Sequence, residues 1–445
     1  MRMTTPICDI ARRDAERDAL RLHMPGHKGA GFLGVEQWDI TEIDGADSLY
    51  EAAGIIRESE DNASAIFGAP TFYSTEGSSQ CIRAMLYLVA LHAKKQGKRP
   101  LILAGRNAHK TFLSAVALLD VEIKWLLPKE GESYLSCKVS SEDVAAQLSA
   151  MAEKPTAVYL TSPDYLGNVA DVAAIAAVCH RYGVLLVVVN AHGAYLKFLQ
   201  PSRHPMDLGA DICCDSAHKT LNVLTGGAYL HIGKNAPAGF AANAKSAMAL
   251  FGSTSPSYLI MASLDLCNRY LAKNFSTPLT DCVEKLEVLR RKLTQNGWQV
   301  EDTDPLRVTV NVPDGVTGAE LADRLRRHGV ECEYADPEFL VFMATPSNTQ
   351  EDFDRVAKAL GVNTAPAAVR APLPVAIGAR ACSVRDALFA PHETIPAAEG
   401  LGRVCASPTV SCPPAIPIAV SGEVIGKEAM ELFNHYNVST LDVLL

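Results

Sequence analysis

Lys219 is the side chain of this sequence best suited to hold a cofactor covalently. It lies in the run Asp215–Thr220, directly after the apolar stretch Ile212–Cys214, with Ser216 and His218 beside it. Enzymes that use pyridoxal phosphate hold it as a Schiff base on one lysine and bind its phosphate with nearby polar groups. The run therefore predicts a pyridoxal phosphate site in which Lys219 is catalytic and Ser216 and His218 contact the cofactor.

Lys110 is a rival for this role, because it too follows a histidine. We prefer Lys219 because it comes after an apolar strand pattern that ends in the run Ala191–Ala194. The histidine of that run, His192, is a further candidate for catalysis and cofactor contact. The pair Gly226–Gly227, shortly after Lys219, leaves room for the backbone to approach closely.

Gly77, Ser78 and Ser79 stand where a long amphipathic helix is predicted to begin. Backbone N–H groups at a helix N-terminus bind anions, and small hydroxyl side chains add donors. A serine at such a position is by itself more typical of an ordinary helix cap. Because Lys219 follows downstream, we interpret the three residues as a phosphate-binding turn.

His109 follows a short apolar strand pattern at residues 101–104. Ligands of open α/β sheets bind at the carboxyl ends of strands, so this imidazole can lie flat against a cofactor ring. The alternative is a histidine in a surface loop. We count His109 among the candidate catalytic and cofactor-binding residues.

Two polar stretches lie in the first fifty residues. His23 and His27 belong to a turn-rich run, but no carboxylate or cysteine stands at the spacing of metal ligands, so we expect no metal site. The acidic run Thr41–Asp47 is typical of a solvated loop, and its alternative role is to hold a cationic substrate.

Helix and strand patterns alternate from Gly68 to Val189, which predicts a mostly parallel sheet covered by helices. After Ser276 the pattern becomes that of a smaller α+β unit, which a segment from about Val375 extends. We therefore expect an α/β fold in three parts. They are an N-terminal arm at residues 1–50, a cofactor-binding large domain at 51–275 and a C-terminal small domain at 276–445.

Composition limits the class of protein. The chain has 445 residues, 48% of them hydrophobic, and a formal net charge of −9, which argues against nucleic acid or an anionic membrane as main partner. We find no apolar run of membrane-spanning length and no signal peptide. The 12 cysteines form no C-x-x-C motif, so we expect reduced, buried thiols in a cytoplasmic protein.

Taken together, these motifs resemble those of bacterial Orn/Lys/Arg decarboxylases, pyridoxal phosphate enzymes of the aspartate-aminotransferase fold (fold type I), in their compact form. The resemblance covers segments 23–29, 41–49, 67–79, 106–110, 161–163, 191–194, 215–220, 253–258, 402–404, 413–417 and 422–423, in the same order. It implies a fold type I large domain with a mixed, mostly parallel sheet. It also implies a smaller C-terminal α+β region that ends in a decarboxylase-type extension.

Carried over by position, the resemblance implies that Lys219 holds the cofactor and that His109 stacks on its pyridine ring. The groups around the phosphate would be Ser78, Ser79, Ser216 and His218. Thr254 would approach that phosphate from a neighbouring subunit. Because the active site of the compact members lies at a dimer interface, we expect at least a homodimer with a shared site.

Two positions depart from the family pattern. The family strand reads Asp-Glu or Asp-Asn before Ala-His-Gly, and this aspartate pairs with the pyridinium nitrogen, whereas Val189 and Asn190 stand here. An apolar neighbour disfavours a charged pyridinium and makes the ring a poorer electron sink. Asn190 cannot replace the aspartate, because adjacent strand residues point to opposite faces. Asn222 also replaces a proline that is common in the family.

The resemblance implies decarboxylation of arginine, lysine or ornithine to the amine, with Lys219 or a nearby histidine returning a proton to Cα. The acidic candidates for facing the side-chain cation are Asp44, Asp47 and Glu393. The alternatives are transamination or elimination, and a cofactor-binding protein without activity. The departures from the family pattern at Val189 and Asn222 allow three interpretations. The protein is a natural variant of low activity, an enzyme of different chemistry, or a protein with an engineered substitution.

Overall fold

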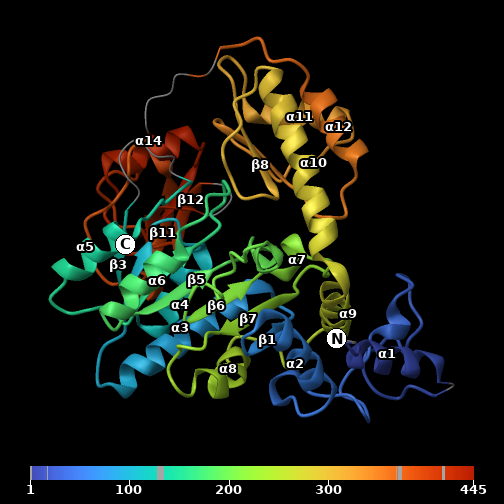
Figure 1. Ribbon diagram of the computed structural model, residues 1–445. Helices are drawn as coiled ribbons and strands as arrows, with labels where there is room; N and C mark the ends of the chain where they lie inside the picture. The colour runs from blue at the N-terminus through green and yellow to red at the C-terminus, as the bar shows by residue number, and fades with distance from the viewer. Residues whose placement is uncertain (1–2, 18, 128–134, 367, 369–372, 413–415) are drawn as a thin grey trace. The chain divides into compact units, whose positions relative to one another are not determined.

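The computed structural model describes residues 3–17, 19–127, 135–366, 368, 373–412 and 416–445 (Figure 1). The motif expected at 413–417 therefore lies partly outside the described residues. The chain forms two compact units, each made of two segments. The first unit comprises residues 1–98 and 172–277, and the second comprises residues 99–171 and 278–445.

Seven strands form one mixed sheet, in the order β1-β7-β6-β5-β4-β2-β3. The first unit contributes β1 (Thr71–Ser74), β5 (Leu185–Val189), β6 (Ile212–Asp215) and β7 (Ala228–Ile232), and the second contributes β2 (Leu101–Gly105), β3 (Glu122–Leu126) and β4 (Ala157–Thr161). β7 runs antiparallel to β1 and β6, whereas β5 pairs with β6, and β2 with β3 and β4, in parallel. Strands such as β2 and β5 are buried along nearly their whole length, which explains their continuous apolar sequences.

The first unit surrounds its strands with helices. These are α1 (Pro6–Glu16), α2 (Ile55–Phe67), α3 (Gly77–Lys95), α6 (Val172–Arg181), α7 (Ala217–Thr220), α8 (Phe240–Ala249) and α9 (Tyr258–Asn274), with 3-10 turns at Glu36–Trp38, Leu49–Glu51 and Ala194–Phe198. The buried side chains of α3 recur at helical spacing, as at Ile82, Met85 and Val89, and α3 packs against β6 and β7. The helix that begins at the predicted phosphate turn is thus anchored on the strands next to Lys219.

The second unit adds smaller antiparallel sheets to its three strands of the large sheet. Its helices are α4 (Lys110–Leu119), α5 (Ser141–Ala150), α10 (Ser276–Gln295, which begins in the first unit), α11 (Gly318–Arg327), α12 (Gln350–Leu360), α13 (Val384–Phe389) and α14 (Lys427–His435), with a 3-10 turn at Ala397–Glu399. Its other strands are β8 (Arg307–Asn311), β9 (Tyr334–Ala335), β10 (Phe339–Met343), β11 (His392–Pro396), β12 (Thr409–Cys412), β13 (Ile416–Val420) and β14 (Thr440–Leu444). They pair as β8-β10-β9, β11-β14 and β12-β13.

A buried ion pair joins two distant motifs of the second unit. Arg106, directly after β2, donates from both terminal nitrogens to the two carboxylate oxygens of Glu423, each at 2.8 Å. Its guanidinium also lies 4.8 Å from the ring centre of Trp125. A bidentate pair of this kind fixes orientation as well as position, so the loop that leads from Arg106 to His109 is held at its start.

The structure confirms the predicted α/β class and most of the predicted elements. The strand predicted at 101–104 corresponds to β2 within one residue, and β4 and β5 lie in the stretch from Gly68 to Val189 where helix and strand patterns alternate. α10 begins at Ser276, the residue after which the sequence predicts a smaller α+β unit. The proposed domain limits at 50 and 275 stay a prediction.

Eleven described cysteines are free, and eight of them are buried, as expected from the sequence. None of the helices in the described part of the chain is both long and apolar enough to cross a membrane.

Candidate active site

Lys219 and His192 are in direct contact. Lys219 Nζ lies 2.7 Å from His192 Nε2. Lys219 lies in α7, just after β6, and His192 in the turn after β5, and these parallel strands end at the same edge of the sheet. The imidazole is buried, and Lys219 is partly exposed. An amine hydrogen-bonded to an imidazole nitrogen can exchange a proton with it, as acid–base chemistry requires.

The predicted phosphate turn meets the lysine run at the N-terminus of α3. Ser216 Oγ donates to Ser78 Oγ at 2.7 Å. Gly77 has a φ of +69°, in the left-handed region that favours glycine, and its N–H donates to the Gly226 carbonyl at 2.7 Å. The hydroxyl pair therefore lies at the positive end of a helix of 19 residues, an arrangement that suits a phosphate.

His218 and two glycines border the same turn. The backbone N–H and the ring Nδ1 of His218 both contact the Gly227 carbonyl, at 3.1 and 2.9 Å. A Cβ on Gly77 would lie 4.0 Å from His218 Cε1, and a Cβ on Gly226 would lie only 2.7 Å from the Thr75 carbonyl oxygen. The close backbone approach predicted at the glycine pair is thus confirmed. Burial lowers the pKa of His218 below its ordinary value, which favours the neutral imidazole.

Val189 lies on an apolar face of the strand ends. It pairs with Cys214 across the parallel ladder of β5 and β6, so the two side chains share a face. Burial raises the pKa of Cys214 well above its ordinary value, and the positive charge of Lys219 opposes this shift, which places the lysine near that face. Cys81 of α3 also acts on the Cys214 thiol, so the same face looks toward α3. At this point of the ladder, the face therefore presents an apolar side chain and a neutral thiol.

Asp215 lies on the reverse face of the same strand ends. Its carboxylate accepts from Asn190 Nδ2 at 2.8 Å and from His204 Nε2 at 2.9 Å, and it lies 3.2 Å from His231 Nε2. All four side chains are fully buried. Burial alone would raise the pKa of Asp215, but the two imidazoles hold it well below its ordinary value. Asn190 therefore points away from the face of Val189, as strand alternation predicts.

The ligand atoms of His204, Asp215 and His231 lie within 4.8 Å of one another, close enough to hold a metal ion. However, Nδ1 of His204 accepts the N–H of Met206 at 3.3 Å, so the proton of a neutral ring is on Nε2, facing the carboxylate. A metal needs a bare nitrogen at that position. We therefore interpret the three groups as a hydrogen-bonded network, which the sequence did not reveal because isolated histidines on separate elements form no pattern.

The structure does not test the predicted roles of Thr254, Ser79 and His109. Thr254 is exposed in the loop before α9, and among the described residues it makes none of the hydrogen bonds that join the cluster. Ser79 lies in the first turn of α3. His109 belongs to the second unit, where its Nδ1 accepts the Thr111 N–H at 3.2 Å and so caps α4. The roles of these three residues toward a cofactor stay predictions, and the rival Lys110 is exposed.

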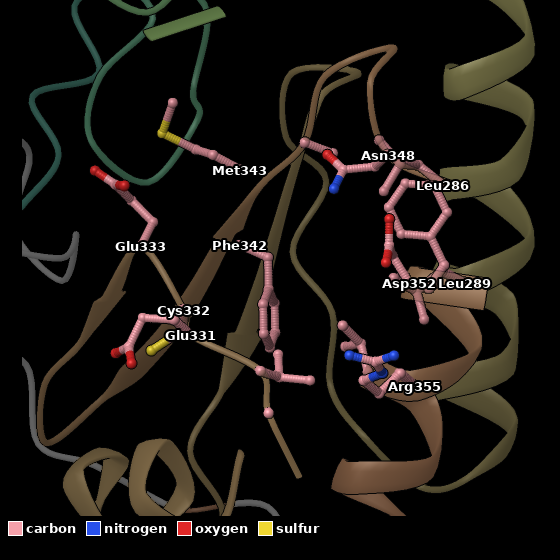
Figure 2. Close-up of a pocket in the computed structure, with 15 residues that line it drawn as sticks. Leu286, Leu289, Glu331, Cys332, Glu333, Phe342, Met343, Asn348, Asp352 and Arg355 are labelled. Atoms are coloured by element: carbon pink, nitrogen blue, oxygen red, sulfur yellow. The ribbon is translucent and has the colours of Figure 1, made fainter. Parts of the chain in front are cut away.

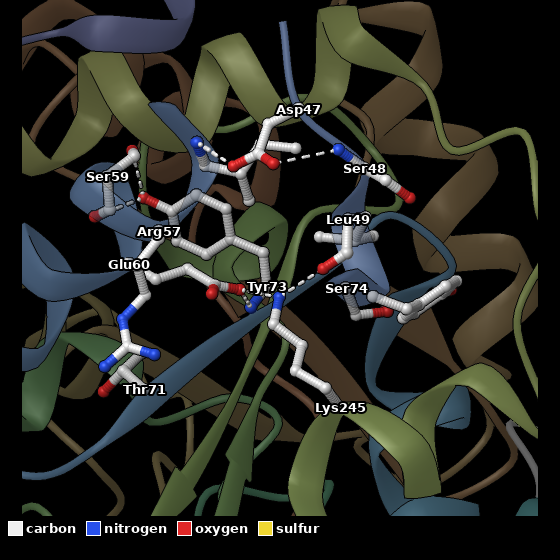
Figure 3. A network of polar contacts seen from close by, with 12 residues as sticks. Asp47, Ser48, Leu49, Arg57, Ser59, Glu60, Thr71, Tyr73, Ser74 and Lys245 are labelled. Carbon is white, nitrogen blue, oxygen red and sulfur yellow. Dashed lines mark hydrogen bonds and ion pairs between the residues drawn. The ribbon is translucent and has the colours of Figure 1, made fainter. Parts of the chain in front are cut away.

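Part of the acidic run has a structural role (Figure 3). Asp47 Oδ2 accepts the N–H of Gly54 at 2.8 Å and that of Ile56 at 3.2 Å, and so stabilises the start of α2. Nearby, Lys245 Nζ forms an ion pair of 2.5 Å with the buried carboxylate of Glu60. The candidate role of Asp47 toward a substrate cation stays a prediction.

A cavity of about 390 Å³ in the second unit contains none of the predicted site residues (Figure 2). It lies among α10, α12 and the end of β10, with Phe342 and Leu286 in its lining. Its acidic groups have partners, because Arg326 Nε donates to Glu331 at 3.0 Å and Asp352 accepts the Thr349 N–H at 2.8 Å. The cavity therefore adds no group to the candidate active site.

Residues 5–312 match the family model described as Orn/Lys/Arg decarboxylase, major domain. The chain belongs to this family. The arginine decarboxylase of Bacillus subtilis (strain 168) is 28% identical over 95% of this chain and 92% of its own length. The arginine decarboxylase of Halalkalibacterium halodurans is 28% identical over 99% of this chain and 94% of its own length.

Solved structures share the fold at low sequence identity. The lysine decarboxylase of Francisella novicida has a TM-score of 0.80 and 16% identity, and the match covers 100% of this chain and 81% of that one. A serine palmitoyltransferase of Sphingomonas wittichii has a TM-score of 0.58 and 14% identity, with 81% of this chain and 83% of that one covered. The predicted fold type I architecture is thus confirmed.

Proposed function

We propose that this protein is a pyridoxal phosphate-dependent decarboxylase of a basic amino acid: arginine, lysine or ornithine. The observation that carries the proposal is the 2.7 Å contact between Lys219 Nζ and His192 Nε2, next to the hydroxyl pair at the N-terminus of α3. The relatives named arginine decarboxylase and lysine decarboxylase support this class of substrate.

The residues at the strand ends fit two parts of the cofactor. The N-terminal N–H groups of α3, with Ser78, Ser79, Ser216 and His218, would hold the phosphate, and the Lys219 amine would form the covalent link. Bound pyridoxal phosphate supplies an electron sink for the bond pair that remains when the carboxylate leaves. At Val189 the fit is poorer, because an apolar side chain offers no charge to the ring nitrogen.

Lys219 and His192 would share the proton chemistry. The buried imidazole accepts a hydrogen bond from the amine and so keeps Lys219 oriented. After CO₂ leaves, Cα requires a proton, and the Lys219 amine is its candidate donor. His192 Nε2 faces this amine, so it could take up the proton that Lys219 loses before it acts as a nucleophile, and later return that proton to Lys219.

A second candidate function follows from Val189. A pyridoxal phosphate protein of low or no activity would tolerate an uncharged environment beside the ring nitrogen, whereas transamination and elimination stay alternatives that need the same electron sink. The buried position of Val189 and the location of Asp215 on the opposite face support this alternative.

We also propose a homodimer, in the cytoplasm, whose active site takes Thr254 from the partner subunit. The exposure of Thr254 supports this proposal, because the side chain remains available to a second subunit.

One experiment separates these functions. The purified protein is incubated with pyridoxal phosphate and each of the twenty common amino acids or ornithine, and the products are identified by mass spectrometry. Release of CO₂ with the amine of arginine, lysine or ornithine is the expected result. A keto acid would indicate transamination. Cofactor absorbance without any product would support the inactive alternative.

A further inference from the structure

We infer that Asp215 is a positioning residue for the Lys219–His192 pair and acts on it from the reverse face of the sheet. The inference rests on the proposed role of Lys219 as the lysine that links the cofactor. Its basis is that the buried Asp215 carboxylate contacts the end of β5, after which His192 follows, and itself ends β6, after which Lys219 follows.

At the end of β5, Asp215 acts through Asn190. The Asn190 amide nitrogen donates to Asp215 Oδ1 at 2.8 Å, and its amide oxygen packs against the turn that follows. A Cβ on Gly193 would lie 1.9 Å from this oxygen, so the amide and the turn fit together only with glycine there. The Gly193 N–H also donates to the Asn190 carbonyl at 2.8 Å. The turn that carries His192 is therefore built on an amide that Asp215 orients.

At the end of β6, Asp215 acts through its own backbone. Ser216 follows it directly, and the Lys219 N–H donates to the Ser216 carbonyl at 3.0 Å. The Asp215 side chain is itself fixed, because Oδ2 contacts Nε2 of His204 at 2.9 Å and of His231 at 3.2 Å. These histidines come from different segments, one before β6 and one on β7. The short helix that carries Lys219 thus starts from an immobilised residue.

Asp211 provides a matched control at the opposite end of the same strands. It is buried and accepts the backbone N–H of Leu186 of β5 at 2.7 Å, and a histidine, His180, lies 3.0 Å away through Nε2. Asp211 and Asp215 therefore both tie β5 to β6 with a carboxylate that contacts imidazole. They differ in that only Asp215 lies at the carboxyl ends, next to Lys219.

The test compares Asp215→Asn with Asp211→Asn. The carboxylate of Asp215 accepts from three donors through two oxygens, whereas an asparagine has one oxygen and one NH₂ group. In Asp215→Asn, at least one of the three donors would therefore face the NH₂ group. Each variant is mixed with pyridoxal phosphate, and two quantities are measured at equal folded fraction. They are the total bound cofactor, after gel filtration, and the rate at which borohydride-stable cofactor accumulates on Lys219, by peptide mapping.

We expect Asp215→Asn to retain cofactor through the phosphate turn but to form the Lys219 link about ten- to a hundredfold more slowly, the effect of misplacing reacting groups by about 1 Å. Asp211→Asn should form the link at the wild-type rate. Equal linkage rates in the two variants would overturn the inference. A loss of bound cofactor in Asp215→Asn as large as its loss of linkage rate would also overturn it, because a merely structural role lowers both quantities together.

Two further variants keep the test decisive if Asp215→Asn does not fold. Asn190→Ala removes one donor and leaves the two imidazoles in place, so it should also slow the link, and wild-type kinetics would contradict the inference. His204→Gln retains an N–H donor and should restore the rate that His204→Ala loses. A wild-type protein that links no cofactor to Lys219 would instead contradict the proposed function itself.

Discussion

The two faces of the ends of β5 and β6 carry opposite chemistry, although their residues alternate one by one along the chain. The face shared by Val189 and Cys214 is uncharged beside β5 and looks toward Lys219 and α3. The reverse face holds the ionised carboxylate of Asp215 with its amide and imidazole partners. The position of a carboxylate along the strand, or on one strand and not its neighbour, therefore decides its role. It either faces a ligand or holds the two strands together on the reverse face.

The comparison also shows why the reverse face tolerates a buried charge. The Asp215 carboxylate is surrounded by N–H groups from three residues, and a buried charge with such partners is stable. Removing one partner from a buried ion pair typically costs about 3–5 kcal/mol. A carboxylate introduced at the buried Val189 would be stabilised by the positive charge of a protonated cofactor ring.

The largest effect is expected from Lys219→Ala, which removes the amine proposed to link the cofactor. Formation of the cofactor link should stop, and decarboxylation should fall by at least about a thousandfold, since loss of a covalent catalytic group has effects of that order. Borohydride reduction with peptide mapping measures the link. Lys110→Ala is the control and should retain both properties. A cofactor label on Lys110 in the wild-type protein would refute the site assignment.

The next largest effect should come from Val189→Asp, which gives the apolar face the charge that it lacks. A carboxylate beside the ring nitrogen would raise the pKa of the pyridinium and stabilise the carbanionic transition state. Decarboxylation of arginine, lysine or ornithine should rise by about a hundredfold, because one well-placed electrostatic partner supplies two or three factors of ten. The variant without cofactor should be less stable, and bound cofactor should offset this loss.

Val189→Asn is the matched control for this prediction, because it is polar and similar in volume to the aspartate but carries no charge. It should give little of the increase in decarboxylation rate that we expect for Val189→Asp. A cofactor analogue with a C–H group in place of the ring nitrogen provides a readout independent of turnover. The wild-type protein should bind the analogue and pyridoxal phosphate alike, whereas Val189→Asp should prefer pyridoxal phosphate. If Val189→Asp folds, binds the cofactor and gains no activity, the weakened-decarboxylase interpretation is wrong.

A smaller effect is expected from Ser216→Ala, which removes one hydroxyl of the pair at the N-terminus of α3. A hydrogen bond to a charged group contributes about 1.5–3 kcal/mol, so the affinity for pyridoxal phosphate should fall by about tenfold or more. Fluorescence titration of the protein without cofactor gives the dissociation constant. Ser141→Ala, which loses a hydroxyl that donates to the Glu142 carboxylate within α5 of the second unit, is the control. An unchanged affinity in Ser216→Ala would remove this residue from the phosphate site.

The smallest signal should come from subunit mixing, which tests whether Thr254 completes the site of a partner. Lys219→Ala and Thr254→Ala protomers, each impaired alone, are mixed and allowed to exchange. Random exchange makes half of the dimers mixed, each with one intact site, so about one quarter of the wild-type activity should return. Absence of recovery, with exchange verified by mass spectrometry, would show that Thr254 is not shared.

The sequence by itself determined the class of fold and predicted most of the groups proposed for cofactor chemistry. Continuous apolar runs such as Val184–Val189 are typical of buried strands of a parallel sheet, and the glycine and serine residues at 77–79 are typical of a helix start. Lys219 was found because its polar neighbours are adjacent in the chain. The departure at Val189 was also visible, since strand alternation assigns its face without coordinates.

Only the tertiary structure revealed the support of the site. His204 and His231 stand alone in the sequence, and folding brings both to Asp215, because a loop before β6 and the neighbouring strand β7 converge there. The structure also shows one role for Asn222. Its backbone N–H contacts the Cys267 thiol, and a proline at this position has no N–H group to do so. Contacts between residues far apart in sequence depend on strand order and side-chain direction, and local patterns do not encode these.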